Sequence, residues 1–181
     1  MATVIARPGT DECAEYYLQY ADLAPDGDIL AHMAEQIGVL ERLLGALTEE
    51  QAACSFAPGE WTIKQVVGHL VDAERIMGYR AYTIARDETA VLPGFNQDYY
   101  AEQGDFNSWT LAEMLEEFGL LRRANLIAFR HLTAEQSTRR GVASGNPVSV
   151  RAQLYILAGH VNRHVEDLRE QYGCGEGVDR R

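Results

Sequence analysis

Apolar residues recur at steps of three and four along four long segments of this 181-residue chain, and this periodicity restricts its fold most strongly. Such steps place side chains on one face of an α-helix. Each helix must bury its apolar face against the others, so the pattern predicts an all-α four-helix bundle. The apolar positions of the first segment are Ile29, Met33, Ile37, Leu40, Leu44 and Leu47.

Capping residues set the expected limits of the helices. Hydroxyl side chains accept hydrogen bonds from the free amides of a first helical turn. On this ground Thr62 and Ser149 are candidate N-caps, as is either Ser108 or Thr110. The expected long helices are about 28–47, 62–86, 110–132 and 149–172, with a short helix at about 11–20.

The stretches between the later helices, 87–109 and 133–147, are expected to be irregular because they lack helical periodicity. The chain contains no repeat, low-complexity tract or linker that would divide it. We therefore expect one domain over 1–181. Its parts are an N-terminal extension at 1–27, a core at about 28–172 and a flexible, glycine-rich tail at 173–181.

The charge of the chain excludes some classes of partner. Sixteen basic residues against 27 acidic ones give a net charge of −11, which disfavours nucleic-acid binding and docking on an anionic membrane. No apolar run is long enough to span a membrane, and the first residues lack a signal-peptide pattern. Cys13, Cys54 and Cys174 are odd in number and scattered, which is typical of reduced thiols, so we expect a cytoplasmic protein.

Three histidines have the spacing of a metal site. His160 and His164 are four residues apart and lie on one face of the last long helix, and His69 lies on the corresponding flank of an earlier helix. Three imidazoles can hold a divalent ion with one coordination position open. The alternative is that each is a hydrogen-bonded residue at the edge of the core. His32 and His131 lack such partners and are expected to have packing or helix-end roles.

Three acidic residues lie close to these histidines in the helical pattern. Asp72 and Asp167 each follow a histidine by three residues, so they are candidates to orient the rings from the second coordination sphere. Glu74 falls near the centre of an apolar face, where a carboxylate is costly unless paired. It is expected either to form a structural ion pair with Arg80 or Arg151, or to act as a general base or second-sphere group.

The stretch 93–102 is aromatic and polar together. Long segments of this kind often form binding loops, so Asn96, Gln97, Asp98 and Tyr99 are candidates to line a substrate pocket. The alternative is a short helix that begins at Asn96 and packs Tyr99 on the bundle. The signatures of serine hydrolases, phosphate-binding loops, dinucleotide sites and di-iron carboxylate bundles are missing from the sequence.

The chain resembles the DinB-like family of metal-binding bundles, which includes the YfiT-type proteins. The resemblance covers about 28–172. The segments that carry it are PGEWTIKQVVGHLVDAER (58–75), PGFNQDY (93–99), PVSVR (147–151) and AGHVNRH (158–164). Two positions depart from the family pattern: Asn96 stands where Asp is frequent, and Arg163 stands where a further histidine is common.

The resemblance implies an up-down-down-up bundle, often a homodimer, with nickel or zinc on His69, His160 and His164. Some relatives use low-molecular-weight thiols such as bacillithiol or mycothiol. We therefore expect a divalent-metal-dependent enzyme that acts on a small molecule as a thiol-dependent transferase or a hydrolase. The alternative is a non-catalytic metal-binding protein of a stress response or interaction.

Overall fold

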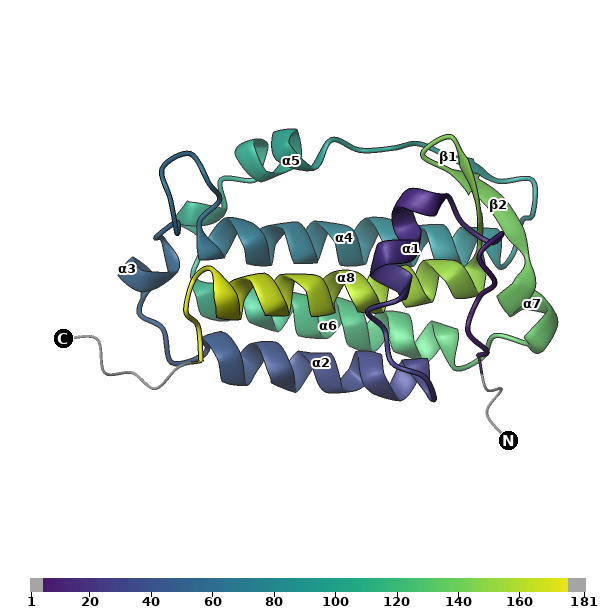
Figure 1. Ribbon diagram of the computed structural model, residues 1–181, viewed down its shortest axis with the longest axis horizontal. Helices are drawn as coiled ribbons and strands as arrows, with labels where there is room; N and C mark the ends of the chain where they lie inside the picture. Colours follow the sequence, from purple (N-terminus) through teal and green to yellow (C-terminus); the bar gives the residue numbers. More distant parts are fainter. Residues whose placement is uncertain (1–4, 176–181) are drawn as a thin grey trace.

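A computed structural model describes residues 5–175 and confirms the all-α four-helix bundle (Figure 1). In the bundle α4 and α6 run in one direction and α2 and α8 in the other, which is the expected up-down-down-up order. α4 packs against α6 and α8, and α2 packs against the same two helices. The four helices are α2 (Ile29–Leu44), α4 (Ile63–Ile84), α6 (Leu111–Phe129) and α8 (Val150–Glu170).

The helices begin at the predicted caps. The Thr62 and Thr110 hydroxyls accept from the backbone amides three residues ahead, and Ser149 does the same for α8. Thr110, and not Ser108, is the cap of α6. Each cap satisfies a backbone donor that the helix itself leaves free. None of the helices described in residues 5–175 is long and apolar enough to cross a membrane.

The two stretches expected to be irregular contain regular elements, so that expectation is wrong. The first holds β1 and α5, and the second holds a helix and a hairpin with its turn at Ser144 and Gly145. These strands have two to four residues, too few for a period of two to stand out. The elements are β1 (Val91–Leu92), α5 (Gln97–Gln103), η1 (Phe106–Ser108), α7 (Ala134–Thr138), β2 (Arg140–Ala143) and β3 (Asn146–Ser149).

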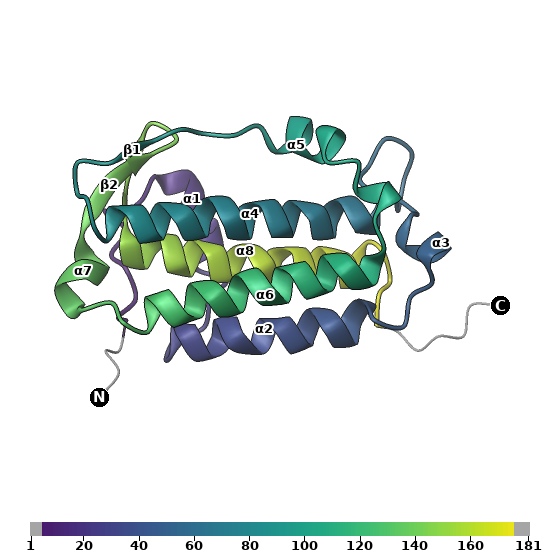
Figure 2. The same cartoon turned by 180° about the vertical axis from the view of Figure 1, so that it is seen from behind.

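The three strands form a small sheet at one end of the bundle, beside α7 (Figure 2). β2 pairs antiparallel with β3, and β1 adds in parallel to β2. The connection from α4 to α6 therefore runs back along the bundle above α4 and carries α5 with it. A further short helix, α3 (Glu49–Ala52), follows α2 and was not expected from the sequence.

The N-terminal segment packs on α8. The short helix predicted at 11–20 is α1 (Glu15–Ala21). It approaches so closely that a Cβ atom on Gly159 would lie 1.6 Å from the Tyr20 carbonyl oxygen, so only glycine fits there. Glu12 also ties this segment to α8. Burial opposes ionisation of Glu12, but hydrogen bonds from Arg151, Gly9 and Ser149 outweigh it and lower its pKa to about 2.

The predicted flexible tail at 173–181 is described only as far as residue 175. Within that part Cys174 is buried, and its amide donates to the Leu168 carbonyl oxygen. The beginning of the tail is therefore docked on the bundle. Residues 176–181 lie outside the described residues.

The apolar core consists of two clusters, one toward each end of the bundle. Met33 and Phe129 belong to the cluster nearest the sheet, and Leu70 and Phe118 to the cluster nearest α3. Full burial of such a side chain contributes about 1.5–3 kcal/mol. Along each long helix the change from one cluster to the other occurs near mid-length, and buried polar residues gather at this junction.

Glu74 lies in this junction and pairs with Arg122, so the expected pairing with Arg80 or Arg151 is wrong. Arg122 Nε donates to Glu74 Oε2 at 2.9 Å, and both side chains are fully buried. Asn125 Nδ2 donates to Glu74 Oε1 at 2.8 Å. Arg122 was missed because sequence periodicity does not reveal that α6 faces α4. Arg80 instead reaches the hairpin, and Arg151 pairs with Glu12.

Removal of one partner of the Glu74–Arg122 pair should lower the free energy of unfolding more than removal of both partners. Arg122→Leu leaves a buried carboxylate without its cation and should lower the free energy of unfolding by about 3–5 kcal/mol. The double variant Glu74→Leu/Arg122→Leu should recover most of that loss. Urea unfolding followed by circular dichroism measures both, with the exposed Arg123→Leu as control. Equal losses in the single and double variants would contradict this account.

Candidate metal centre

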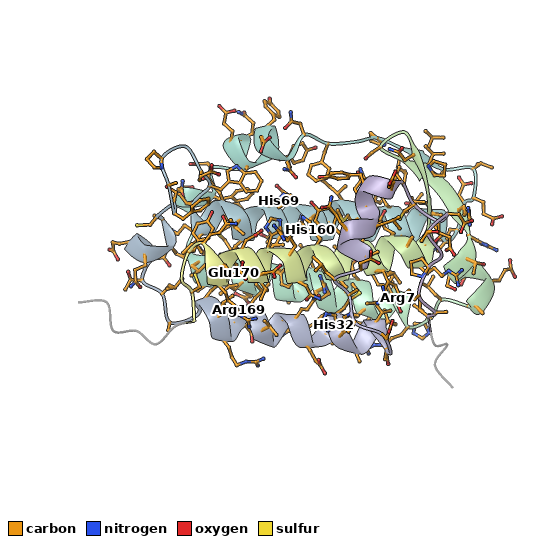
Figure 3. All side chains as sticks on the ribbon, in the orientation of Figure 1. Arg7, His32, His69, His160, Arg169 and Glu170 are labelled. Carbon is orange, nitrogen blue, oxygen red and sulfur yellow. The ribbon has the colours of Figure 1, made fainter. Side chains whose placement is uncertain are left out.

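Side chains of α4 and α8 bring three histidine rings together, and Figure 3 labels two of these residues, His69 and His160. His69 comes from α4, and His160 and His164 come from successive turns of α8. His160 Nε2 lies 2.9 Å from His69 Nε2 and 3.2 Å from His164 Nε2. The candidate ligand atoms of the three residues all lie within 4.8 Å of one another.

Aromatic neighbours hold two of the rings in place. The Trp61 ring packs against His69 with a centroid separation of 5.1 Å, and the Tyr20 ring packs edge-on against His160 at 5.5 Å. Tyr20 reaches His160 because α1 lies directly on Gly159. Packing against these aromatic rings therefore helps to orient His69 and His160.

Burial keeps the three imidazoles neutral. Desolvation lowers the pKa of His69 to about 3 and that of His164 to about 4, with neighbouring positive charge as the second cause. The pKa of His160, which is almost wholly buried, is also lowered well below its ordinary value, first by desolvation and then by the other two histidines and Arg122. Neutral imidazole is the form that offers a lone pair to a metal.

The spacing of the nitrogens fits a divalent ion. Two nitrogens bound tetrahedrally to one zinc ion at about 2.0–2.1 Å are roughly 3.3 Å apart. The two short separations here, 2.9 and 3.2 Å, are close to that value. One N–H···N hydrogen bond explains one of these contacts. It does not explain both, because one shared proton joins only two of the three nitrogens.

The proposed second-sphere carboxylates have different surroundings. Asp167 Oδ2 lies 3.5 Å from His164 Nδ1, on the side of the ring that faces away from the cluster. No hydrogen bond joins Asp72 to His69 in residues 5–175, and Glu74 is occupied by Arg122. His160 Nδ1 is buried and has no hydrogen-bond partner among the described residues.

His69 and His160 lie at the wall of a cavity of about 440 Å³, which we call the histidine cavity; His164 does not line it. Of the predicted pocket residues, Asn96 and Gln97 line it. Tyr99 instead lines a separate hollow together with Asp72, and Asp98 lines neither. Tyr99 is exposed because α5 turns it away from the histidines. The residues that line the histidine cavity are Tyr16, Tyr17, Tyr20, His69, Met77, Arg80, Phe95, Asn96, Gln97, Ser144, Ile156 and His160.

Asn96 also caps α5, because its side chain accepts from the amides of Asp98 and Tyr99. The short helix that was considered as the alternative is therefore present, but Tyr99 is mostly exposed and is not buried against the bundle. The tyrosines of α1 and Arg80 were not predicted as pocket residues. The tyrosines could have been found from the sequence, because Tyr16, Tyr17 and Tyr20 are spaced by three and four residues and so lie along one side of a helix.

Two histidines stay apart from the cluster, as expected. His32 Nε2 lies 3.2 Å from Asn162 Oδ1 and 3.3 Å from Gln36 Nε2, so it belongs to the buried polar junction. His131 is exposed just beyond the end of α6. In the described part of the chain the metal-compatible group of histidines is thus limited to three.

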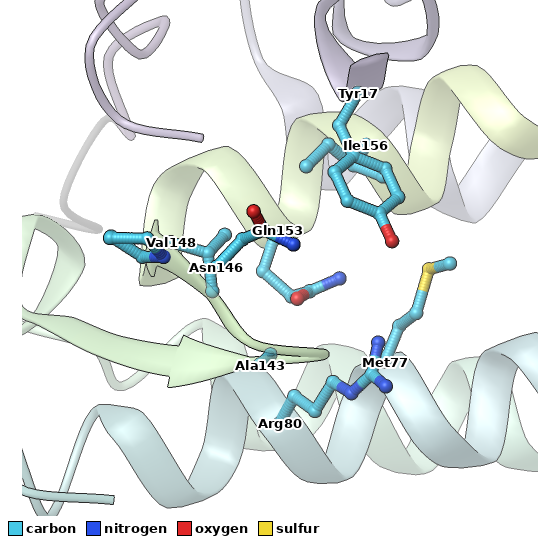
Figure 4. A pocket seen from close by; sticks show the side chains of 9 residues that line it. Tyr17, Met77, Arg80, Ala143, Asn146, Val148, Gln153 and Ile156 are labelled. Atoms are coloured by element: carbon cyan, nitrogen blue, oxygen red, sulfur yellow. The ribbon is translucent and has the colours of Figure 1, made fainter. Parts of the chain in front are cut away.

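A smaller recess adjoins the histidine cavity (Figure 4). Its volume is about 20 Å³, and it shares four lining residues with the larger space. The shared residues are Tyr17, Met77, Arg80 and Ile156, and the recess adds Gln153 and Asn146 together with apolar parts of the hairpin.

Comparison of the sequence with known proteins identifies a family. The DinB superfamily model matches residues 32–168. Two proteins of Oceanobacillus iheyensis, both provisionally named as metal-dependent hydrolases, are similar to this chain. The first is 30% identical over 72% of this chain and 75% of the relative. The second is 27% identical over 66% of this chain and 69% of the relative.

A solved structure shares the fold. It is YfiT from Bacillus subtilis, described as a probable metal-dependent hydrolase with an unusual four-helix bundle topology. It superposes with a TM-score of 0.72 over 92% of this chain and 93% of that chain, at 19% identity. Because the family model spans most of the sequence, including all three histidines, the chain belongs to the DinB superfamily.

Proposed function

We propose that this protein is a divalent-metal-dependent hydrolase of a small molecule, with His69, His160 and His164 as the metal ligands. The observation that carries the proposal is the convergence of three neutral histidines, two of which, His69 and His160, line a cavity. The names of the Oceanobacillus relatives and the description of YfiT support the hydrolytic class. Nickel and zinc are the proposed ions because imidazole suits both.

A divalent ion in this position would act as a Lewis acid and make a water molecule more acidic. The protein residues have complementary tasks. Burial, the largest cause, raises the pKa of Tyr20 to about 12, so its hydroxyl stays protonated and can donate a hydrogen bond. Asn96 and Gln97 add amide groups that can orient a polar substrate. Asp167 lies behind His164 and can hold its ring.

One observation favours thiol-dependent transfer as a second candidate. None of the described residues that line the histidine cavity is a carboxylate, so the cavity wall offers no acidic side chain as a general base. A thiol requires less help than water, because its pKa is only about 8.5. We keep a low-molecular-weight thiol as a proposed cosubstrate of this second activity, and a homodimer as the proposed assembly.

The ligand set can be tested by metal analysis of protein purified without an affinity tag. We expect about one nickel or zinc ion per chain in the natural protein and a loss of at least tenfold in His164→Ala. The helical circular dichroism should persist, because the two apolar clusters do not depend on the metal. His131→Ala, at an exposed histidine, is the matched control and should retain the ion.

Unchanged metal content in His164→Ala would contradict the ligand assignment, whereas unfolding of that variant would indicate a structural metal. Turnover is tested separately on metal-loaded protein with panels of small esters and amides, with and without an added thiol. Turnover without thiol supports the hydrolase, and turnover only with thiol supports the transferase. A tightly bound metal without any turnover would favour a non-catalytic metal-binding protein.

The buried histidines also predict a pH dependence of stability in the metal-free protein. Their folded pKa values are depressed, so the unfolded chain binds more protons below about pH 6.5. Stability should therefore fall as the pH decreases from about 6.5 toward 4, by up to about 1.4 kcal/mol per pH unit for each histidine. Urea midpoints at several pH values measure this. His164→Asn should show a shallower slope, and a flat profile between pH 7 and 5 would refute the effect.

A further inference from the structure

Arg80 is a buried cation without an acidic partner. Its side chain is 5% exposed, and no carboxylate of the described residues forms an ion pair with it. Nη2 donates to the Pro93 carbonyl oxygen at 2.8 Å and to Ser144 Oγ at 2.9 Å. Nε and Nη1 have no acceptor in residues 5–175, and Arg80 lines both the histidine cavity and the recess. The guanidinium is thus anchored on one side and free on the other.

A second buried polar group points into the same recess. Gln153 is 3% exposed, yet its amide forms no hydrogen bond with any residue that the structure describes. Figure 4 shows the polar ends of Arg80, Gln153 and Tyr17 approaching one another from α4, α8 and α1. The Gln153 amide opens onto the recess, so it is available to donate a hydrogen bond to a group that enters there.

The charge around the recess has a single sign. The chain has 27 acidic residues, yet none of those described lines either the recess or the histidine cavity. Among the described residues that line the recess and the histidine cavity, Arg80 is the only charged one. Burial lowers the pKa of Arg80, which is the desolvation cost that an incoming anion would offset.

We propose that the recess binds a carboxylate of the substrate on Arg80 and Gln153, and that this selects small carboxylic acids for the histidine cavity. The proposal rests on the proposed function in taking this cavity as the substrate site. The recess, at about 20 Å³, has room for roughly one water-sized group, such as one carboxylate oxygen, and the rest of the carboxylate would lie in the adjoining histidine cavity. One of the two free guanidinium donors can donate to one carboxylate oxygen, and the Gln153 amide can donate to the other.

The position of the recess indicates how far the substrate must extend toward the histidines. Arg80 lies three turns after His69 on α4, roughly 16 Å along the axis, and Gln153 lies two turns before His160 on the antiparallel α8, roughly 10 Å. Met77 and Ile156 line the space between. The substrate is therefore a carboxylic acid with an apolar middle, and its reactive bond lies on the side of the histidines.

Binding to metal-free protein tests this proposal independently of the metal site. The probes are 3-phenylpropionate and its neutral amide, 3-phenylpropanamide, measured by calorimetry. We expect the acid to bind at least about tenfold more tightly than the amide, the usual scale for a charged hydrogen-bonded pair. Arg80→Gln should abolish this preference. Gln153→Leu should weaken binding of the acid several-fold without loss of fold, because Gln153 makes no hydrogen bond in the structure.

Arg75→Gln is the matched control. Arg75 lies on the same helix but lines the separate hollow with Tyr99, so its loss should leave the preference intact. Equal binding of the two probes, no binding of either, or a preference that survives Arg80→Gln would overturn the proposal. Since the protein carries no metal here, such a result would leave the proposed metal chemistry standing, and a failed metal analysis would leave the carboxylate site standing.

Discussion

The rest of the structure depends on the buried ion pair of Glu74 and Arg122, which joins α4 to α6. Arg122 of α6 also donates to the Met33 carbonyl oxygen and to Gln36 Oε1 of α2, at 3.1 and 2.7 Å. Gln36 in turn donates to the Ala158 carbonyl oxygen of α8 at 2.7 Å. One polar layer thus links all four helices between the two apolar clusters, and an unpaired member would be costly.

The histidine cluster occupies the same level of the bundle. The charge of Arg122 contributes to the lowered pKa of His160, so the polar layer and the candidate metal centre interact electrostatically. The up-down-down-up order places α4 beside α8, which brings His69 opposite His160. The long connection that this order requires between α4 and α6 runs over α4 and supplies Phe95, Asn96 and Gln97 to the cavity.

The sequence predicted the features that depend on local spacing. Helical periodicity predicted the bundle, and hydroxyl caps such as Thr62 predicted where its helices begin. The spacing of the histidines and their places on the helix flanks predicted which of them belong together. Features that depend on how helices face one another could not be predicted in this way. The partner of Glu74 was assigned wrongly for this reason, and Tyr99 was expected in a pocket from which α5 turns it away. Arg80 was considered only as an ion-pair partner, because its exposure to a cavity is a tertiary property.

The central claim is that His69, His160 and His164 bind one divalent ion. X-ray absorption spectroscopy of nickel- or zinc-loaded protein tests it most directly, because it reports the kind, number and distance of the atoms around the metal. The account predicts three imidazole nitrogens, at about 2.0–2.1 Å for zinc, with the remaining positions filled by oxygen or nitrogen of solvent or ligand. A spectrum with sulfur ligands, or with fewer than three imidazoles, would contradict it.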